Sequence, residues 1–149
     1  MPVLRIVALE KQDSPNFHYV GMICMILGIG ADIIELSRLA DVKQTFLNRV
    51  YTSNEISNLS DSPARRGEQL AGMFAAKEAV VKALGHGFGR IRPNEIDIFH
   101  NDDGCPKVCL SGNAKTAFDT LGANTVHISI SHCKDYAVAY AIVEGRLTP

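Results

Sequence analysis

The chain has 149 residues, of which 46% are hydrophobic and 21% are charged, and its formal net charge is -1. These values are typical of one globular domain that is large enough to bury a core. A net charge near zero provides no general attraction to nucleic acid or to an anionic membrane, so neither is expected as a partner. The four cysteines form no CxxC pair, which favours reduced thiols in a cytoplasmic protein over a disulfide scaffold or a zinc site.

Residues 1–24 differ from the rest of the chain. A short apolar piece is followed by KQDSPNFH, which has neither helical nor strand periodicity. The segment lacks the continuous apolar run of a signal peptide and is too polar to span a bilayer, and no later run is long enough to do so. We therefore predict an irregular N-terminal arm at 1–24 and a single domain at 25–149.

The domain begins with MILGIGADIIEL, an apolar run with β-branched residues that predicts a buried strand at 25–36. Gly28 and Gly30 indicate a bend or the close approach of another backbone. Asp32 lies within this apolar run, where a carboxylate must be hydrogen-bonded, protonated or bound to a cation. It either caps the turn after the strand or belongs to a site.

A basic, helical region follows the strand. Apolar residues recur at close to helical spacing over 36–50, and Thr52 and Glu55 fit a capping box that opens another short helix. Arg38 and Arg49 are among the positive charges of this region. Such charges either form a solvated face or bind an acidic partner.

The stretch LAGMFAAKEAVVKALG predicts a long, mostly buried helix at 70–85, which the cap sequence DSP leads into and Gly85 ends. Within it, Glu78 and Lys82 are four residues apart and lie beside a flank of small alanines. The two charges are either an ordinary helical ion pair or part of a site, because the small flank would let a ligand come close.

The rest of the chain predicts alternating strands and helices. In order, these are a glycine-rich turn, a hairpin that turns at NDDG, a helix, and a second hairpin that turns at HCKD: residues 85–90, 95–110, 111–121 and 125–144. His132, in the last turn, is either a hydrogen-bonding residue or a catalytic one. Unequal helices between two hairpins predict an α+β fold with a mainly antiparallel sheet packed on the long central helix.

Four pieces of the chain occur in an order that resembles one family. They are GIGADIIE with Asp32, LAGMFAAKEAVVKALG with Glu78 and Lys82, DDGCPKV, and VHISISH with His132. Together they resemble the small holo-[acyl-carrier-protein] synthases, the short class of 4'-phosphopantetheinyl transferases, over residues 25–144. The resemblance implies that family's fold, a place in fatty acid biosynthesis, and transfer of the 4'-phosphopantetheine arm of coenzyme A to a serine of apo-acyl carrier protein, which leaves 3',5'-ADP.

The resemblance also implies a magnesium-dependent active site. Asp32 and Glu78 would hold Mg²⁺, which takes one or two carboxylates together with waters and substrate phosphates. Lys82 would contact the same phosphates and stabilise or protonate the leaving group, and Asp32, directly or through a water on the metal, would take the serine proton. Contacts to coenzyme A are expected from Lys77, Lys82, Gly85, Ser131 and His132.

Two expectations concern partners, and one position departs from the family. Its members form trimers with sites between subunits, so a homotrimer is expected here. Arg38 and Arg49 resemble the surface that docks the acidic carrier protein. The family often has an arginine where this chain has Met73. The residues expected to hold the 3'-phosphate instead are His86, Arg90 or Lys134.

Two other functions stay open from the residues themselves. One is a different magnesium-dependent transferase of phosphoryl groups, which uses Asp32 and Glu78 on another substrate. The other is a non-catalytic module that binds coenzyme A or a nucleotide, in which Glu78 and Lys82 form only an ion pair. Incubation with coenzyme A and an apo carrier protein separates them, because only the synthase adds the mass of phosphopantetheine to the carrier.

Overall fold

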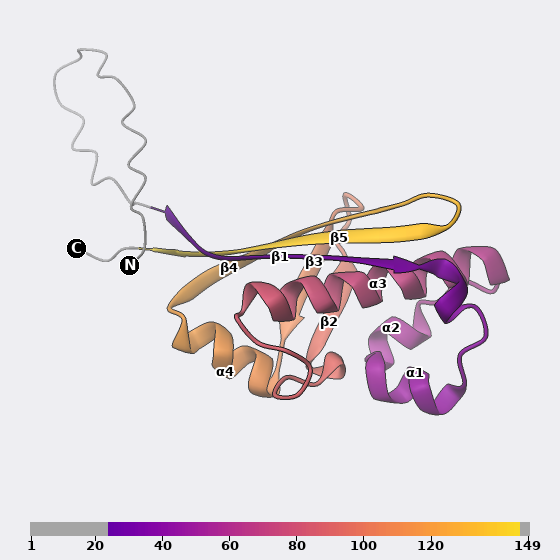
Figure 1. The fold of residues 1–149 in the computed structure, drawn as a ribbon, viewed down its shortest axis with the longest axis horizontal. Coiled ribbons are helices and arrows are strands. Elements are labelled where there is room, and N and C mark those ends of the chain that lie inside the picture. The colour runs from indigo at the N-terminus through magenta and orange to yellow at the C-terminus, as the bar shows by residue number, and fades with distance from the viewer. Residues whose placement is uncertain (1–23, 147–149) are drawn as a thin grey trace, which may run out of the picture.

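The computed structural model describes residues 24–146 and shows a three-stranded sheet with a long helix along one face (Figure 1). The strand order is β1 (Cys24–Glu35), β5 (Tyr136–Arg146) and β4 (Ala123–His132), and both pairings are antiparallel. The helix is α3 (Pro63–Ala83). The predicted α+β fold is confirmed, whereas the predicted arm lies, except for Cys24, outside the described residues.

The remaining elements are short and surround α3 (Figure 1). They are, in chain order, η1 (Leu36–Leu39), α1 (Gln44–Val50), α2 (Ser53–Ser57), η2 (Pro93–Glu95), β2 (Ile96–His100), β3 (Pro106–Leu110) and α4 (Gly112–Thr120). Strands β2 and β3 form a separate antiparallel hairpin, as predicted. None of the helices within residues 24–146 is long and apolar enough to cross a membrane.

Helix α3 lies directly on strand β1 because two glycines of the strand have no side chain. A Cβ atom built on Gly28 would lie 1.9 Å from the carbonyl oxygen of Ala83, and one built on Gly30 would lie 1.9 Å from that of Ala79. The predicted close approach of backbones is therefore confirmed. The expectation that the alanine flank leaves room for a ligand is wrong, because Ala79 and the other alanines of that flank are fully buried.

The opposite face of the sheet is left uncovered in the single chain. Residues of β5 alternate between the two faces, with Ala139 and Ala141 buried against the core and Tyr140 pointing the other way. On the edge strand β1, Ile29 and Ile33 point to that same outer face and are 65% and 63% exposed. The sheet therefore presents a band of large apolar side chains away from α3.

The predicted elements differ from the observed ones mainly at their ends. The region 36–50 is two pieces, η1 and α1, because a turn at residues 40–41 is followed by irregular backbone in which Lys43 is extended. The spacing of the apolar residues predicted one helix. A turn between two segments does not interrupt this spacing when the apolar residues of both segments face the core. Helix α3 starts at Pro63, in the cap sequence predicted to lead into it, so it extends the predicted stretch toward the N-terminus with proline at its first position.

Candidate active site

Strand β1 and helix α3 bring together two of the predicted site residues. The Nζ atom of Lys82 lies 2.8 Å from Oδ1 of Asp32 and also donates a hydrogen bond, 3.0 Å long, to the carbonyl oxygen of Ala31. The two side chains remain partly accessible, at 47% for Lys82 and 18% for Asp32. Because Gly30 lets the helix rest on the strand, the tip of Lys82 reaches Asp32 across the junction.

Glu78 lies one helical turn before Lys82 and is partly buried. Burial raises the pKa of Glu78 above its ordinary value of 4.5, and the negative charge of Asp32 raises it further, while Lys82 opposes both effects. The effect of Asp32 means that the two carboxylates lie close enough to repel each other. Asp32, Glu78 and Lys82 thus form one cluster, which we call the acid cluster.

The acid cluster has the donor set that a magnesium ion needs when it is shared with a phosphate ligand. Within residues 24–146, no group of three or more His, Cys, Asp or Glu side chains is placed to enclose a metal. Mg²⁺ does not require such a cage, because it keeps several waters and takes phosphate oxygens in addition to one or two carboxylates. A cation between Asp32 and Glu78 would also offset the repulsion that raises the pKa of Glu78.

The structure gives Lys77 a different place from the one expected for a ligand contact. Its ammonium lies 2.8 Å from Oε2 of Glu55, and neither side chain has any exposed surface. It also donates hydrogen bonds to the carbonyl oxygens of Pro93, at 3.0 Å, and Ile96. Burial lowers the pKa of Lys77, with the charge of Glu55 acting in the opposite direction. Lys77 therefore holds α3 to α2 and β2, and within the described chain it has no exposed surface with which to contact coenzyme A as expected.

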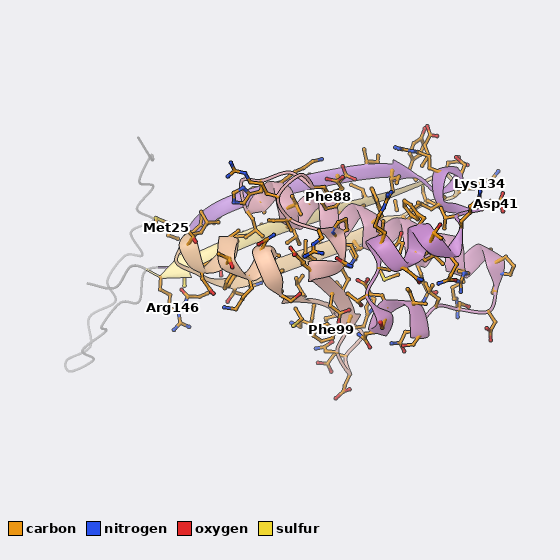
Figure 2. The ribbon with its side chains drawn as sticks, turned by 90° about the horizontal axis from the view of Figure 1, so that it is seen from below. Met25, Asp41, Phe88, Phe99, Lys134 and Arg146 are labelled. Carbon is orange, nitrogen blue, oxygen red and sulfur yellow. The ribbon has the colours of Figure 1, made fainter. Side chains whose placement is uncertain are left out.

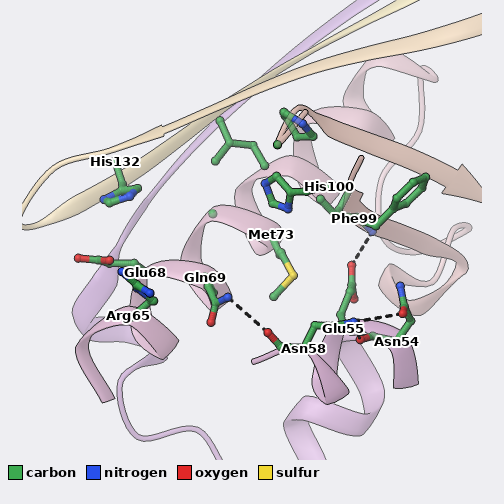
Figure 3. Close-up of a pocket in the computed structure, with 15 residues that line it drawn as sticks. Asn54, Glu55, Asn58, Arg65, Glu68, Gln69, Met73, Phe99, His100 and His132 are labelled. Carbon is green, nitrogen blue, oxygen red and sulfur yellow. Dashed lines mark hydrogen bonds between the residues drawn. The ribbon is translucent and has the colours of Figure 1, made fainter. Parts of the chain in front are cut away.

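Another predicted site residue, His132, lies in a cavity on a different side of α3 from the acid cluster. This cavity, of about 1010 Å³ and called the polar pocket below, is formed by α2, α3, the β2–β3 hairpin and β4 (Figure 3). The lining residues that matter here are Glu55, Arg65, Glu68, Met73, His100 and His132. Met73 and Glu78 are five positions apart on α3, so their side chains project about 140° apart. The polar pocket and the acid cluster of one chain therefore face different directions.

The other residues named from the sequence lie outside the polar pocket. Gly85 has a φ of 76° and ends α3 in a Schellman motif, in which its amide bonds to the carbonyl of Lys82 and the next amide bonds to that of Val81. Ser131 pairs with Val138 and points to the outer face of the sheet, opposite to His132. Lys134 lies beyond β4, at the same end of the molecule as Asp41 (Figure 2).

Two lining residues were not assigned to a site from the sequence. They are Arg65, near the start of α3, and His100, the last residue of β2. Both line the polar pocket, whereas the residues expected to hold a phosphate near Met73 do not line it: His86, Arg90 and Lys134. The spacing of residues in the sequence cannot predict which side chains line this pocket, because the β2–β3 hairpin and helix α3 meet only in the tertiary fold.

A smaller, apolar pocket of about 370 Å³ lies beside the acid cluster. Its walls come from β1, η1, α1 and α3: Ile34, Leu39, Val42, Phe46 and Phe74, with Arg38 and Lys43 also lining it. Ile34 is two residues after Asp32 on β1, and Phe74 is one turn before Glu78 on α3. The apolar pocket and the acid cluster therefore adjoin along both elements.

The comparisons with known proteins agree with one another. A model of the 4'-phosphopantetheinyl transferase superfamily matches residues 28–141. The holo-[acyl-carrier-protein] synthase of Clostridium kluyveri is 44% identical over 123 residues, which are 80% of this chain and 91% of that protein. The solved structure of a Bacillus anthracis holo-(acyl-carrier-protein) synthase in complex with coenzyme A (3',5'-ADP) matches with a TM-score of 0.67 and 36% identity, over 84% of this chain and 99% of that chain. The Helicobacter pylori synthase in complex with coenzyme A matches with a TM-score of 0.66 and 32% identity, over 77% of this chain and 98% of that chain.

Proposed function

The chain belongs to the 4'-phosphopantetheinyl transferase superfamily, and on this premise we propose that it is a holo-[acyl-carrier-protein] synthase. It transfers 4'-phosphopantetheine from coenzyme A to a serine hydroxyl of an apo-acyl carrier protein and releases 3',5'-ADP. The observation that carries the proposal is the acid cluster, in which Asp32, Glu78 and Lys82 meet at the junction of β1 and α3. Relatives solved with coenzyme A or its nucleotide support the choice of substrate.

The chemistry assigned to the acid cluster is a displacement at phosphorus. The serine oxygen attacks the phosphorus that carries pantetheine, and the bond from this phosphorus to the bridging oxygen of the pyrophosphate breaks. Asp32 is the proposed acceptor of the serine proton. The ammonium of Lys82, which is 47% exposed, is free on its solvent side to stabilise the negative charge that develops on the leaving 3',5'-ADP.

Magnesium is part of the proposal, with Asp32 and Glu78 as its protein ligands. A bound Mg²⁺ would neutralise the pyrophosphate and the charge that grows during transfer. The support is the pair of mutually repelling carboxylates, which provides negative charge for a cation that also binds phosphate oxygens. Glu78 provides a negative charge for the metal only when its carboxyl group is ionised. Because its pKa is raised, the binding of Mg²⁺ is expected to weaken as the pH falls.

A homotrimer is proposed on the basis of the uncovered sheet face. Ile29, Ile33 and Tyr140 are 65%, 63% and 55% exposed and lie on one side of the sheet. A contiguous apolar band of this kind marks an interaction surface in soluble proteins. A second copy of the chain is the proposed cover, and closed rotational symmetry would let every subunit bury the same band.

The apolar pocket with its basic residues is the proposed docking surface for the carrier protein. Arg38 and Lys43 line the pocket, and Arg49 is exposed on the neighbouring helix α1. An acidic helix that inserts an apolar side chain here would be attracted by the charges. Because Ile34 is two residues from Asp32, docking here would bring the serine near the acid cluster. The cytoplasm and fatty acid biosynthesis are the proposed setting.

The experiment that tests the function is mass spectrometry of an apo-acyl carrier protein after incubation with the chain, coenzyme A and Mg²⁺. The expected result is a gain of one phosphopantetheine mass on the carrier, with 3',5'-ADP in solution. Glu78→Gln is the matched control and is expected to slow the gain by about 100-fold or more while coenzyme A still binds. An unmodified carrier in the presence of the parent chain would instead favour a different transferase or a binding module.

A further inference from the structure

The ammonium of Lys82 holds the position of a cation within the acid cluster. It lies 2.8 Å from Oδ1 of Asp32 and 3.0 Å from the carbonyl oxygen of Ala31. Burial and the charge of Asp32 raise the pKa of Glu78, and the charge of Lys82 opposes them. Lys82 is therefore the counter-charge of both carboxylates. Mg²⁺ takes oxygen ligands of the same kind, so the lysine competes with the metal for Asp32.

The exposure of this ion pair shows that the lysine can leave it. The side chains of Lys82 and Asp32 are 47% and 18% exposed, whereas the buried pair of Lys77 and Glu55 has the same length, 2.8 Å, and no exposed surface. An exposed pair contributes little to stability, because water solvates the separated charges, but breaking a buried pair leaves an uncompensated charge. The Lys82–Asp32 pair can therefore exchange partners, and the Lys77–Glu55 pair cannot.

A phosphate ligand provides the new partner that the lysine needs. A Mg²⁺ ion on Asp32 would lie directly beside the ammonium, and like charges repel strongly at such short distances. The flexible stem of Lys82 lets its ammonium move away. Hydrogen bonds from an ammonium to a phosphate are charge-assisted and strong. The pyrophosphate of coenzyme A would thus withdraw the competitor from Asp32 and also supply oxygens to the metal.

We propose that Lys82 couples the binding of Mg²⁺ to the binding of the pyrophosphate of coenzyme A, because its ammonium pairs with Asp32 in the free chain and moves to the pyrophosphate in the complex. This rests on the proposed function, since it concerns the metal and the substrate of the same site. The free chain then binds Mg²⁺ weakly, and each ligand strengthens the binding of the other by the same factor. Asp32, Glu78 and Lys82 belong to one chain, so the coupling requires no contact between subunits.

The first test is calorimetric titration of Mg²⁺ into the parent chain and into Lys82→Met, both without coenzyme A. The variant is expected to bind Mg²⁺ at least about fivefold more tightly, which is the lower end of typical couplings between sites. Lys43→Met is the matched control, since it removes the same charge from the wall of the adjoining apolar pocket. It should leave the affinity for Mg²⁺ unchanged, because Lys43 lies outside the acid cluster.

The second test is the affinity for coenzyme A in chelator and in excess Mg²⁺. The parent should bind coenzyme A at least about fivefold more tightly with the metal, and this ratio should be smaller in Lys82→Met. Lys82 is partly exposed and methionine favours helices, so thermal unfolding in chelator is expected to match that of the parent. Lys82→Gln repeats both measurements with a polar side chain of lower bulk.

The proposal is overturned if neither Lys82 variant binds Mg²⁺ more tightly than the parent, if Lys43→Met gains as much affinity as Lys82→Met, or if the ratio for coenzyme A is the same in the parent and in both Lys82 variants. Neither measurement needs a carrier protein. A parent chain that shows the coupling but does not modify a carrier would contradict the proposed function alone.

Discussion

The ammonium of Lys77 and the carboxylate of Glu55 lie 2.8 Å apart with no exposed surface on either side chain. Their elements are α3 and α2, and Glu55 additionally accepts a hydrogen bond from the amide of Ile98 in β2. Glu55 therefore links α2, α3 and β2 at the wall of the polar pocket, and its partner Lys77 directly precedes Glu78 of the acid cluster in the sequence. This pair explains why a lysine in the motif of α3 is structural.

Lys77→Met is expected to lower the free energy of unfolding by about 3–5 kcal/mol, because it leaves the carboxylate of Glu55 buried without a counter-charge. Denaturant unfolding monitored by circular dichroism measures this. The double variant Glu55→Gln with Lys77→Met is the control and should recover part of the loss, since no net charge is then buried. A single variant as stable as the parent would contradict the importance of the pair.

Glu78→Gln is expected to lower the rate of transfer by about 100-fold or more, as removal of an electrostatic group at a reacting phosphate does. In the absence of metal it should not destabilise the fold at pH 7, because the variant removes the repulsion between Glu78 and Asp32. Steady-state kinetics and thermal unfolding in chelator test the two parts. Full activity of this variant would exclude Glu78 as a metal ligand.

The same residue predicts a dependence of stability on pH. The pKa of Glu78 is raised in the folded chain above 4.5, so below pH 4.5 the group is protonated in both states and has no effect. As the pH rises from 4.5, the unfolded chain ionises first, and the parent loses stability relative to Glu78→Gln until the folded carboxyl has ionised too. Unfolding curves of both proteins between pH 4 and 8, in chelator, measure the difference. A parent that gains stability relative to the variant over this range would contradict the shift.

Gly30→Ala tests the contact that builds the acid cluster. Its Cβ would lie 1.9 Å from the carbonyl oxygen of Ala79, so α3 must move away from β1, which should cost about 1–3 kcal/mol and weaken transfer. Gly67→Ala is the matched control, since nothing lies within 4 Å of its Cβ inside α3. That change should stabilise the protein by about 0.5–1 kcal/mol. Equal effects of the two substitutions would argue against the close packing.

Ile33→Lys tests the proposed trimer. Ile33 is 63% exposed on the outer face of the sheet, so a charge there should not unfold the subunit, yet it would be buried without a partner in the assembly. Sedimentation velocity is expected to show a trimer for the parent and a monomer for the variant. A trimer that tolerates the lysine would mean that another surface forms the assembly.

Arg38→Glu tests the docking surface. Reversal of a charge at the rim of the apolar pocket should raise the KM for the carrier protein and reduce its dependence on salt, while kcat at saturation changes little. Kinetics at two salt concentrations measure both. Asp41→Ser, at an exposed position close in sequence but outside that pocket, is the control and should not raise the KM. An unchanged KM for Arg38→Glu would exclude this surface.

Much of the secondary structure could be predicted from the sequence, because caps, turns and apolar periodicity depend on residues that are close together in the chain. The capping box of Thr52 and Glu55 forms as predicted, the turn at Gly104 has the positive φ that its sequence requires, and Val126, Ile128 and Ile130 point inward on β4. Periodicity reports which side of an element is apolar. The family motifs, in turn, identified the superfamily and the residues of the acid cluster.

Only the tertiary structure decided which charged residues face solvent and which contact a charged residue of another element. Lys77 and Glu78 are neighbours in the sequence, yet one is fully buried against Glu55 and the other lies partly exposed beside Asp32. His100 joins Arg65 in the polar pocket only because the hairpin folds against α3. A sequence pattern records the apolar period of each element, but the partner of a charge depends on which distant element packs beside it.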